Sequence, residues 1–139
     1  MKVNLFICVL FLLAFFGASC FDNREKEFRK MQVGSYVLDS RTNLGDYDPN
    51  IYKDLKITFN EDGSFIMSKS VPFIYDSCGS WLPSKGGGEE WNWLYYKSNP
   101  SISTQFTEPW SADSIFYLNS VTPKKGQKTI KEIYFRKVK

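Results

Sequence analysis

Four consecutive residues, Gly17 to Cys20, suit covalent processing of the chain. Glycine, alanine and serine are small enough to enter a peptidase site in extended form, and Cys20 provides a thiol to which a membrane anchor could be attached. An almost wholly apolar stretch, residues 5–16, precedes them, and Lys2 lies before that stretch. A positive flank, a short apolar run and small residues are typical of a secretory signal peptide, so this pattern predicts export.

The sequence Gly17-Ala18-Ser19-Cys20 resembles the lipobox of bacterial lipoproteins. In that family, small residues precede a cysteine that becomes diacylglyceryl-modified and then forms the new N-terminus. The resemblance implies that Cys20 is lipidated, that palmitate or similar acyl chains anchor the protein, and that it lies in the cell envelope. Phe21 stands where an aspartate often marks inner-membrane retention, so the resemblance favours the outer membrane.

Two alternatives for the first part of the chain remain open. A permanent transmembrane helix is the weaker one, because the apolar run is shorter than the roughly 20 residues that cross a hydrocarbon core of ~30 Å. The other is ordinary signal cleavage that releases a soluble protein.

The chain of 139 residues divides into three expected parts. Residues 1–19 form the signal peptide, residues 20–32 the lipid-anchored tether, and residues 33–139 a single β domain. The tether is rich in Arg, Glu and Lys. Phe28 and Met31 lie one helical turn apart within it, which predicts one or two turns of helix.

The charge balance predicts no nucleic-acid partner. The formal net charge is only +3 at pH 7, and one of these charges, Lys2, belongs to the signal peptide. Basic residues gather near the C-terminus, where they alternate with Ile130, Ile133 and Phe135. This alternation indicates a strand with one solvated face. Contact of that face with anionic lipid headgroups is the alternative.

The chain has no histidine, which limits its chemistry. Ser-His and Cys-His pairs and His-ligated metals are therefore excluded. Glu89 and Glu90 point to opposite faces of a strand, whereas glycoside hydrolysis needs two carboxylates aimed at one bond. Asp46, Asp48 and Asn50 begin like a calcium loop, but the glycine that its turn requires is missing. We therefore expect a protein that is not an enzyme, with no cofactor or metal.

Cys78 has no expected disulfide partner. Cys8 leaves with the signal peptide and Cys20 is lipidated, so a disulfide framework is excluded. We expect Cys78 to be a buried, small apolar residue with an unreactive thiol.

From Val33 onward, β-branched and aromatic residues alternate with polar ones in short runs and predict an all-β fold. The clearest unit is Leu55–Phe59, a polar turn that ends at Gly63, and Ser64–Met67, which together predict an antiparallel hairpin. The other expected strands are residues 34–39, 71–76, 78–82, 91–97, 102–106, 114–119 and 129–138. About eight or nine short strands favour an antiparallel meander, closed as a barrel or packed as a sandwich.

Gly34-Ser35-Tyr36 resembles the Gly-x-Trp motif of lipocalins, with Tyr in place of Trp. Arg136 resembles the basic residue that packs across this ring and closes the barrel in that family. A second motif, Gly79-Ser80-Trp81, lies mid-chain, as in small lipocalin-like bacterial lipoproteins. The resemblance implies a lipocalin-like barrel of about eight strands over residues 33–139 and a small apolar ligand in its interior.

The aromatic residues are the remaining candidates for a binding site. Trp91, Trp93 and Tyr95 share one face of an expected strand, whereas Leu94 and Tyr96 share the other. Such rings either build the core, enclose an apolar ligand, or form an exposed platform that stacks on sugar rings or on a partner protein. The candidate ligand-binding residues are Trp81, Trp91, Trp93, Tyr95, Phe106 and Trp110.

Together these features predict a membrane-anchored lipoprotein whose lipocalin-like domain binds a small apolar ligand. The alternative is an accessory interaction lipoprotein with a solidly packed barrel and a protein or glycan partner. A barrel of about eight strands is compatible with both, because its interior is either just filled by side chains or holds one small ligand.

Overall fold

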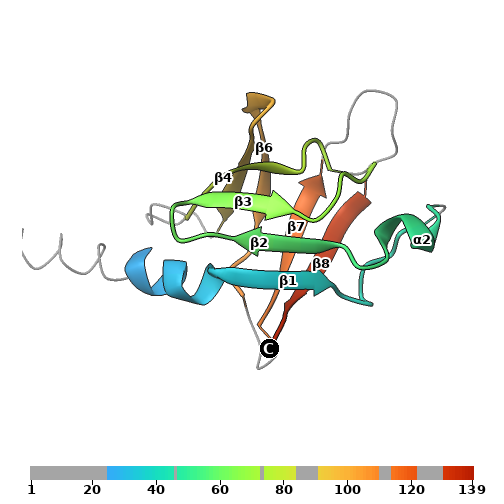
Figure 1. Ribbon diagram of the computed structural model, residues 1–139, viewed down its shortest axis with the longest axis horizontal. Coiled ribbons are helices and arrows are strands. Elements are labelled where there is room, and N and C mark those ends of the chain that lie inside the picture. The colour runs from blue at the N-terminus through green and yellow to red at the C-terminus, as the bar shows by residue number, and fades with distance from the viewer. Residues whose placement is uncertain (1–24, 46, 73, 84–90, 110–113, 122–129) are drawn as a thin grey trace, which may run out of the picture.

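Eight strands close into an antiparallel barrel (Figure 1). This computed structural model describes residues 25–139 except 46, 73, 84–90, 110–113 and 122–129. Each strand pairs with the next along the chain, and the first pairs with the last. The predicted all-β meander is therefore confirmed, as is its closure into a barrel. The expected signal peptide and Cys20 lie outside the described residues.

The described elements follow the chain in a simple order. A helix over residues 25–32 leads into the barrel, as the tether pattern predicts. A second, four-residue helix, α2 (Pro49–Tyr52), lies between the first two strands. The strands are β1 (Gly34–Leu38), β2 (Lys56–Phe59), β3 (Ser64–Met67), β4 (Cys78–Leu82), β5 (Asn92–Tyr96), β6 (Asn99–Phe106), β7 (Ile115–Val121) and β8 (Ile130–Lys137).

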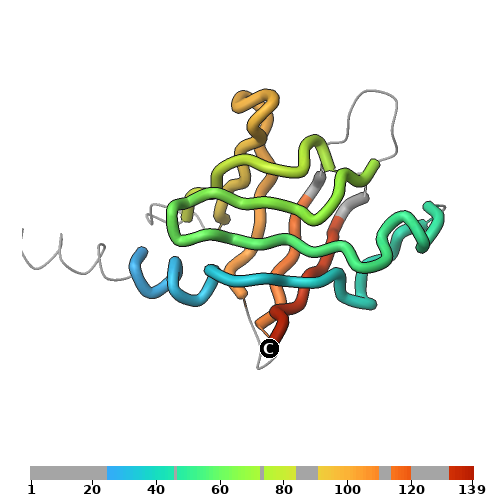
Figure 2. The backbone as a smooth tube through the Cα atoms, viewed as in Figure 1, coloured from blue at the N-terminus to red at the C-terminus, as the bar shows by residue number. Residues whose placement is uncertain are grey.

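Side-chain burial follows the strand period of two. In β5, Asn92, Leu94 and Tyr96 are buried, whereas Trp93 and Tyr95 between them are half-buried. The buried set faces the interior, where the hydrophobic core gathers residues from every strand. Figure 2 shows β1 to β3 as one wall and β6 to β8 as the wall behind it. Each strand therefore has one face turned to the core and one face turned outward.

The hairpin of β2 and β3 is confirmed. Gly63 has φ +83°, a conformation that favours glycine, and its N–H donates to the Asn60 carbonyl at 3.1 Å. The hydroxyl and the N–H of Ser64 both donate to Asp62 Oδ1, at 2.6 and 2.9 Å. These hydrogen bonds hold the pKa of Asp62 below its usual value. The polar turn is thus fixed by its own side chains.

The expected strand over residues 71–76 is wrong. The described part of this segment consists of bends and turns, with the Ile74 N–H donating to the Val71 carbonyl at 3.2 Å. Pro72 lacks the N–H that a ladder requires, and β3 already pairs directly with β4. Val71 and Ile74 are nevertheless buried, so their apolar character reflects packing of a loop onto the core.

The two helices lie at opposite ends of β1 (Figure 1). Helix α2 is not among the elements expected from the sequence, although an aspartate before proline is a helix-start signal. Asp48 caps the helix, since its Oδ1 accepts hydrogen bonds from the Asn50 N–H at 2.9 Å and from Asn50 Nδ2 at 3.0 Å. Asp48 and Asn50, which in the sequence resemble part of a calcium loop, therefore form a helix cap.

Gly79, in the mid-chain motif, lets two strands approach closely. A Cβ atom at this position would lie 1.9 Å from the Tyr95 carbonyl oxygen of β5. No side chain fits there, so glycine is required by contact rather than by a turn. Trp81, two residues later on the same face of β4, is fully buried.

Candidate functional site

Trp81 and Phe106, two of the candidate ligand residues, lie inside the barrel and are fully buried. Phe59 lies between them, with its ring centroid 5.6 Å from that of Trp81 and 5.5 Å from that of Phe106. Phe116 adds a further ring, 5.5 Å from Phe59 and 5.8 Å from Phe106. Aromatic pairs prefer such separations, so these rings are in direct contact. They occupy the space that an enclosed ligand would need here.

The ring cluster continues toward β1 and β8. The Tyr36 centroid lies 4.9 Å from that of Phe116 and 5.8 Å from that of Phe59, with edge-to-face geometry in both pairs. Phe135 stacks on Phe116 at 5.4 Å. All of these side chains are at most 1 % exposed. Rings from opposite walls thus meet in the middle of the barrel.

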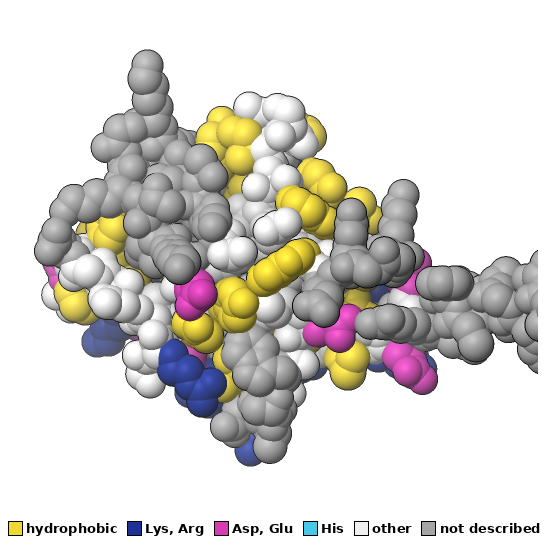
Figure 3. All heavy atoms as spheres, turned by 180° about the vertical axis from the view of Figure 1, so that it is seen from behind, with side chains coloured by type: hydrophobic (Ala, Val, Ile, Leu, Met, Phe, Trp, Pro, Cys, Tyr) yellow, Lys and Arg dark blue, Asp and Glu magenta, His cyan; other side chains and the backbone are white. Residues whose placement is uncertain are grey.

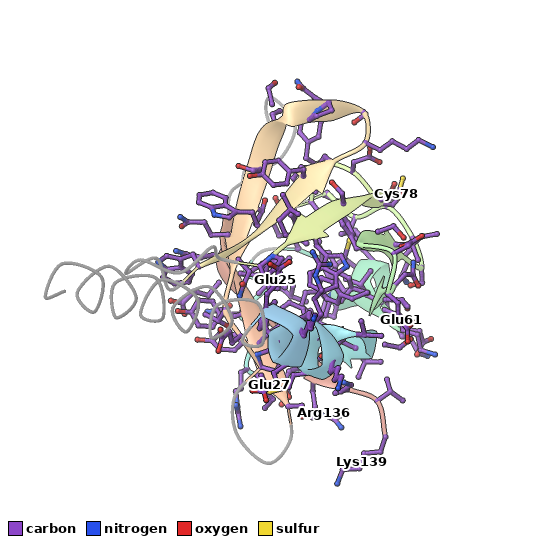
Figure 4. All side chains as sticks on the ribbon, turned by 90° about the vertical axis from the view of Figure 1, so that its left-hand side faces the viewer. Glu25, Glu27, Glu61, Cys78, Arg136 and Lys139 are labelled. Carbon is purple, nitrogen blue, oxygen red and sulfur yellow. The ribbon has the colours of Figure 1, made fainter. Side chains whose placement is uncertain are left out.

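Phe28, from the helix over residues 25–32, closes one end of this cluster. It is buried, and its ring lies 6.2 Å from Trp81 and 6.5 Å from Phe106. Arg29 places its guanidinium 5.0 Å from the Trp81 ring centroid, a cation–π contact. Glu25, labelled in Figure 4, holds that guanidinium through a 3.1 Å ion pair. The tether helix is therefore a plug for this end of the barrel.

The plug is tied to β1 and β8 by polar contacts. The Tyr36 hydroxyl donates a hydrogen bond that is shared between the Gln32 carbonyl at 2.9 Å and the Met31 carbonyl at 3.1 Å. Lys137 Nζ donates to the same Met31 carbonyl at 2.8 Å. The last carbonyls of a helix lack partners within the helix, and a cation near them is favourable. Burial raises the pKa of Tyr36 and lowers that of Lys137.

Gln32 is the exception among these polar groups. Its side chain is fully buried, and neither its Oε1 nor its Nε2 has a hydrogen-bond partner among the described residues. A buried amide without partners costs about 1–3 kcal/mol. The junction between plug and barrel is thus well packed but not fully satisfied in hydrogen bonds.

The expected contact between Tyr36 and Arg136 is wrong. Lys137 takes that place, with Nζ 5.6 Å from the Tyr36 ring centroid. Phe135 faces inward, so the period of two directs Arg136 outward, where its Nε lies 3.6 Å from Asp39 Oδ2. The barrel is closed as expected by β1 and β8, but its inward cation is one residue later in the chain.

A second group of inner rings surrounds Tyr96. Its centroid lies 6.1 Å from that of Phe65 and 5.6 Å from that of Tyr75. Its hydroxyl forms a 2.7 Å hydrogen bond with the hydroxyl of Thr104. Burial raises the pKa of Tyr96 to about 12, because the interior disfavours the charged phenolate. This hydroxyl is thus satisfied by the barrel itself.

A row of rings lies on the outside of the barrel, across β5 to β8. Trp91, just before β5, has its centroid 6.1 Å from that of Tyr117 on β7. Tyr117 pairs with Tyr134 on β8, and their centroids are 5.2 Å apart. All three side chains are half-buried. The row is therefore preformed and accessible at its surface.

A second row of outward side chains runs parallel to the first and is mainly polar. It starts at Trp93, whose neighbours across the strands are, in register order, Gln105, Asn119 and Glu132. Glu132 Oε2 accepts a 2.8 Å hydrogen bond from the Tyr134 hydroxyl. That hydrogen bond is the main reason why the pKa of Tyr134 is raised, since ionisation would remove the donor. Ring and carboxylate thus hold each other in place.

The structure separates the five described candidate ligand residues into two groups. Trp81 and Phe106 belong to the interior, whereas Trp93 and Tyr95 point outward from β5 and Trp91 lies in the outer row. Trp110 lies outside the described residues, as do Glu89 and Glu90.

Tyr117 and Tyr134 were missed by the sequence analysis. The run Phe116-Tyr117-Leu118 is apolar throughout, so its period of two gives no contrast between faces. Tyr117 and Tyr134 each stand between two residues without a polar group, and this contrast on two paired strands could have indicated the outer row.

The expected burial of Cys78 is wrong. Cys78 is only partly buried and is paired in register with Ile66, whose side chain is 54 % exposed. Figure 4 shows the Cys78 side chain at the periphery of the barrel. The cysteine therefore belongs to the outer face of β4, and its small size is not explained by core packing.

A groove lies beside α2, at the end of β1 opposite the plug. Its volume is about 570 Å³, within the usual range of ligand pockets. Its apolar lining comes from Val37, Leu38, Leu44 and Leu55. Tyr52, also in the lining, has its pKa raised to about 12, first by burial and then by Tyr47 and Asp48.

None of the helices in the described ranges is long and apolar enough to cross a membrane. Within the same ranges, no three Cys, Asp or Glu residues lie close enough together to hold a metal ion.

Comparison with known proteins does not assign the chain to a family. No protein-family model, no curated protein and no solved structure matches the sequence.

Proposed function

We propose that this protein is a bacterial lipoprotein that acts by recognition through the outside of a solidly packed barrel. The observation that carries the proposal is the continuous ring cluster from Tyr36 to Trp81, with Phe28 closing its end. Since these rings contact one another, recognition is left to the outer surface and the loops. The lack of histidine supports binding over catalysis.

The proposed anchor is an acylated Cys20 in the outer membrane. Its support is the sequence from Lys2 to Cys20, with a short apolar run that ends in small residues. The described part of the plug helix covers residues 25–32, and Cys20 lies five residues before it in the sequence. Five residues span at most about 18 Å in any conformation, so the plugged end would stay close to the bilayer. Two or three acyl chains give effectively stable attachment, at about 0.8 kcal/mol per buried methylene.

Metabolic labelling with a clickable fatty acid tests the anchor. We expect the wild-type chain to be labelled and to partition into the detergent phase. Cys20→Ala should abolish both, whereas Cys78→Ala, the matched control in the barrel, should be labelled like the wild type. An unlabelled wild-type protein in the aqueous phase would show that the chain is not a lipoprotein.

A small apolar ligand is the second candidate function, and the groove beside α2 favours it. Four aliphatic side chains line about 570 Å³ there, and Asn50, Lys53 and Asp54 supply polar groups at its border. Binding of a fluorescent naphthylamine probe to the full-length chain tests this site. Leu44→Glu should abolish the fluorescence increase, whereas Leu82→Glu, at a position 45 % exposed on β4, should preserve it. Equal fluorescence in both variants would exclude the groove as the probe site.

A further inference from the structure

We infer that the outer side of β5 to β8 is a binding site for a neutral polysaccharide. The site, which we name the outer aromatic face, consists of Trp91, Trp93, Tyr117 and Tyr134 together with Gln105, Asn119 and Glu132. The inference rests on the proposed function, because it specifies what the outside of the packed barrel recognises. The wall that carries this face lies behind β1 to β3 in Figure 1 and faces the viewer in Figure 3.

The rings supply flat apolar surfaces at the right level of exposure. Trp91, Tyr117 and Tyr134 form a contacting row at centroid separations of 6.1 and 5.2 Å, and each side chain is half-buried. The edges of Trp and Tyr rings carry polar N–H and O–H groups. A sugar ring has C–H groups on its faces and hydroxyls at its rim, which matches this combination.

The neighbouring row supplies planar hydrogen-bonding groups. Gln105 and Asn119 are directly paired in register, and each amide offers both a donor and an acceptor. Glu132 follows across β8, and its carboxylate is already positioned by the Tyr134 hydroxyl at 2.8 Å. The hydroxyl groups of a sugar both donate and accept hydrogen bonds, which the amides can satisfy, whereas the rings contact the C–H faces of the sugar. Rings and amides together therefore suit a sugar better than either kind alone.

The charges of this face select a neutral ligand. Glu132 is its one carboxylate, and none of its residues is Lys or Arg. The nearest cations described, Arg41 and Arg136, both lie within ion-pair distance of Asp39, at 3.7 and 3.6 Å. The charge that a ligand would meet within the outer aromatic face is Glu132, which disfavours an acidic polysaccharide or an anionic lipid surface.

A protein partner fits the composition less well. The centres of protein interfaces are enriched in Met and Arg as well as rings, and they are depleted in Glu. Polar side chains of the neighbouring row lie between the rings of the outer aromatic face. Figure 3 shows hydrophobic side chains (yellow) in several separate groups on this side of the molecule. A face that keeps its polar groups accessible is typical of a wet, hydroxyl-rich ligand.

Affinity gel electrophoresis of the detergent-solubilised full-length chain tests the inference. The gels contain a neutral glucan, mannan, xylan or galactan, or one of the acidic polysaccharides alginate and polygalacturonate. We expect at least one neutral polysaccharide to retard the wild-type protein and neither acidic one to do so. Trp91→Ala and Tyr117→Ala should each weaken binding about tenfold, the loss of roughly 1.4 kcal/mol that a stacking ring supplies.

Two controls separate loss of binding from loss of folding. Ile66→Ala, on the outer side of β3, should bind like the wild type, because it removes a surface hydrophobic residue from another wall. Tyr117→Phe keeps the ring and should retain most of the binding, even if Tyr117→Ala unfolds.

The outcomes distinguish the inference from the proposed function. Retardation by no neutral polysaccharide, or equal retardation of wild type and Trp91→Ala, would overturn the glycan site. Either result, including capture of a partner protein by this face instead, would leave the packed, lipid-anchored barrel as proposed. Missing acylation of Cys20 would overturn the anchor and leave the polysaccharide result unchanged.

Discussion

The inner and outer rings of the barrel use the same residue types in different surroundings. Inside, Trp81 and Phe106 are fully buried and contact rings from other strands on several sides. Outside, Trp91 and Tyr117 are half-buried and contact one another along a single row. The inner rings therefore stabilise the barrel, whereas the outer rings keep part of their surface accessible, as the proposed recognition requires. Position in the strand period, rather than residue type, decides which role an aromatic residue has.

The largest expected effect is on an inner tryptophan. Trp81→Ala removes contacts with Phe28 and Phe59 and should lower the free energy of unfolding by about 3–5 kcal/mol. Trp93→Ala, at an outward position of β5, should lower it by less than about 1 kcal/mol. Urea denaturation followed by circular dichroism measures both. Equal losses would break the distinction between inner and outer rings.

The pH dependence of stability sharpens the comparison. The pKa of Tyr96 is raised from 10.0 to about 12 in the folded barrel. The folded state thus binds the phenolic proton more tightly than the unfolded state, and stability is full below pH 10. Above pH 10 it should fall by about 1.4 kcal/mol per pH unit, until the folded protein ionises near pH 12.

Urea denaturation at pH 8, 10 and 11 measures this slope. Since Tyr36 and Tyr52 also have raised pKa values, Tyr96→Phe should reduce the slope rather than remove it. An unchanged slope in Tyr96→Phe would mean that this hydroxyl is not buried.

The junction of plug and barrel should show a coupled effect of intermediate size. Tyr36→Phe and Lys137→Met each remove a donor to the end of the plug helix and should cost about 2 kcal/mol. Because both side chains contact the Met31 carbonyl and each other, the double variant should lose less than the sum. Arg136→Met is the control, and its effect should add to that of Tyr36→Phe. Strict additivity of Tyr36 and Lys137 would contradict the described closure.

The smallest expected effect is a gain in stability. Gln32 is fully buried, and its amide has no hydrogen-bond partner within the described part of the chain. Gln32→Met keeps the shape but removes the polar group, so it should stabilise the protein by about 1 kcal/mol. Thermal unfolding measures the change as a rise in Tm. A clear drop in Tm would show that the amide is satisfied in solution and that the junction differs from our description.

Much of the fold could be predicted from the sequence because strand signals are local. The hairpin turn at Gly63 and the alternation in β5 are both read from neighbouring residues. Residues 71–76 misled the prediction, since a buried loop shows the same apolar residues as a strand. Predicting Lys137 rather than Arg136 as the cation beside Tyr36 would have required the register of β1 with β8, which no local pattern contains.

The candidate site was less predictable than the fold. The sequence grouped Trp91, Trp93 and Tyr95 on one strand face, and the structure places them together. It could not indicate whether that face is the inner or the outer one, because Leu94 and Tyr96 are equally apolar. Tyr117 and Tyr134 join the outer row through the register of β7 with β8 and the contact of Tyr117 with Trp91, which no local pattern contains.

Native mass spectrometry of the full-length protein, purified in mild detergent, tests most directly whether the barrel interior is filled by its own side chains. We predict a mass equal to the processed chain with its acyl groups and no non-covalent adduct after the detergent is removed. A small apolar molecule that stays bound in wild type but is lost in Phe106→Leu would contradict the account. Such a result would place a ligand among the inner rings.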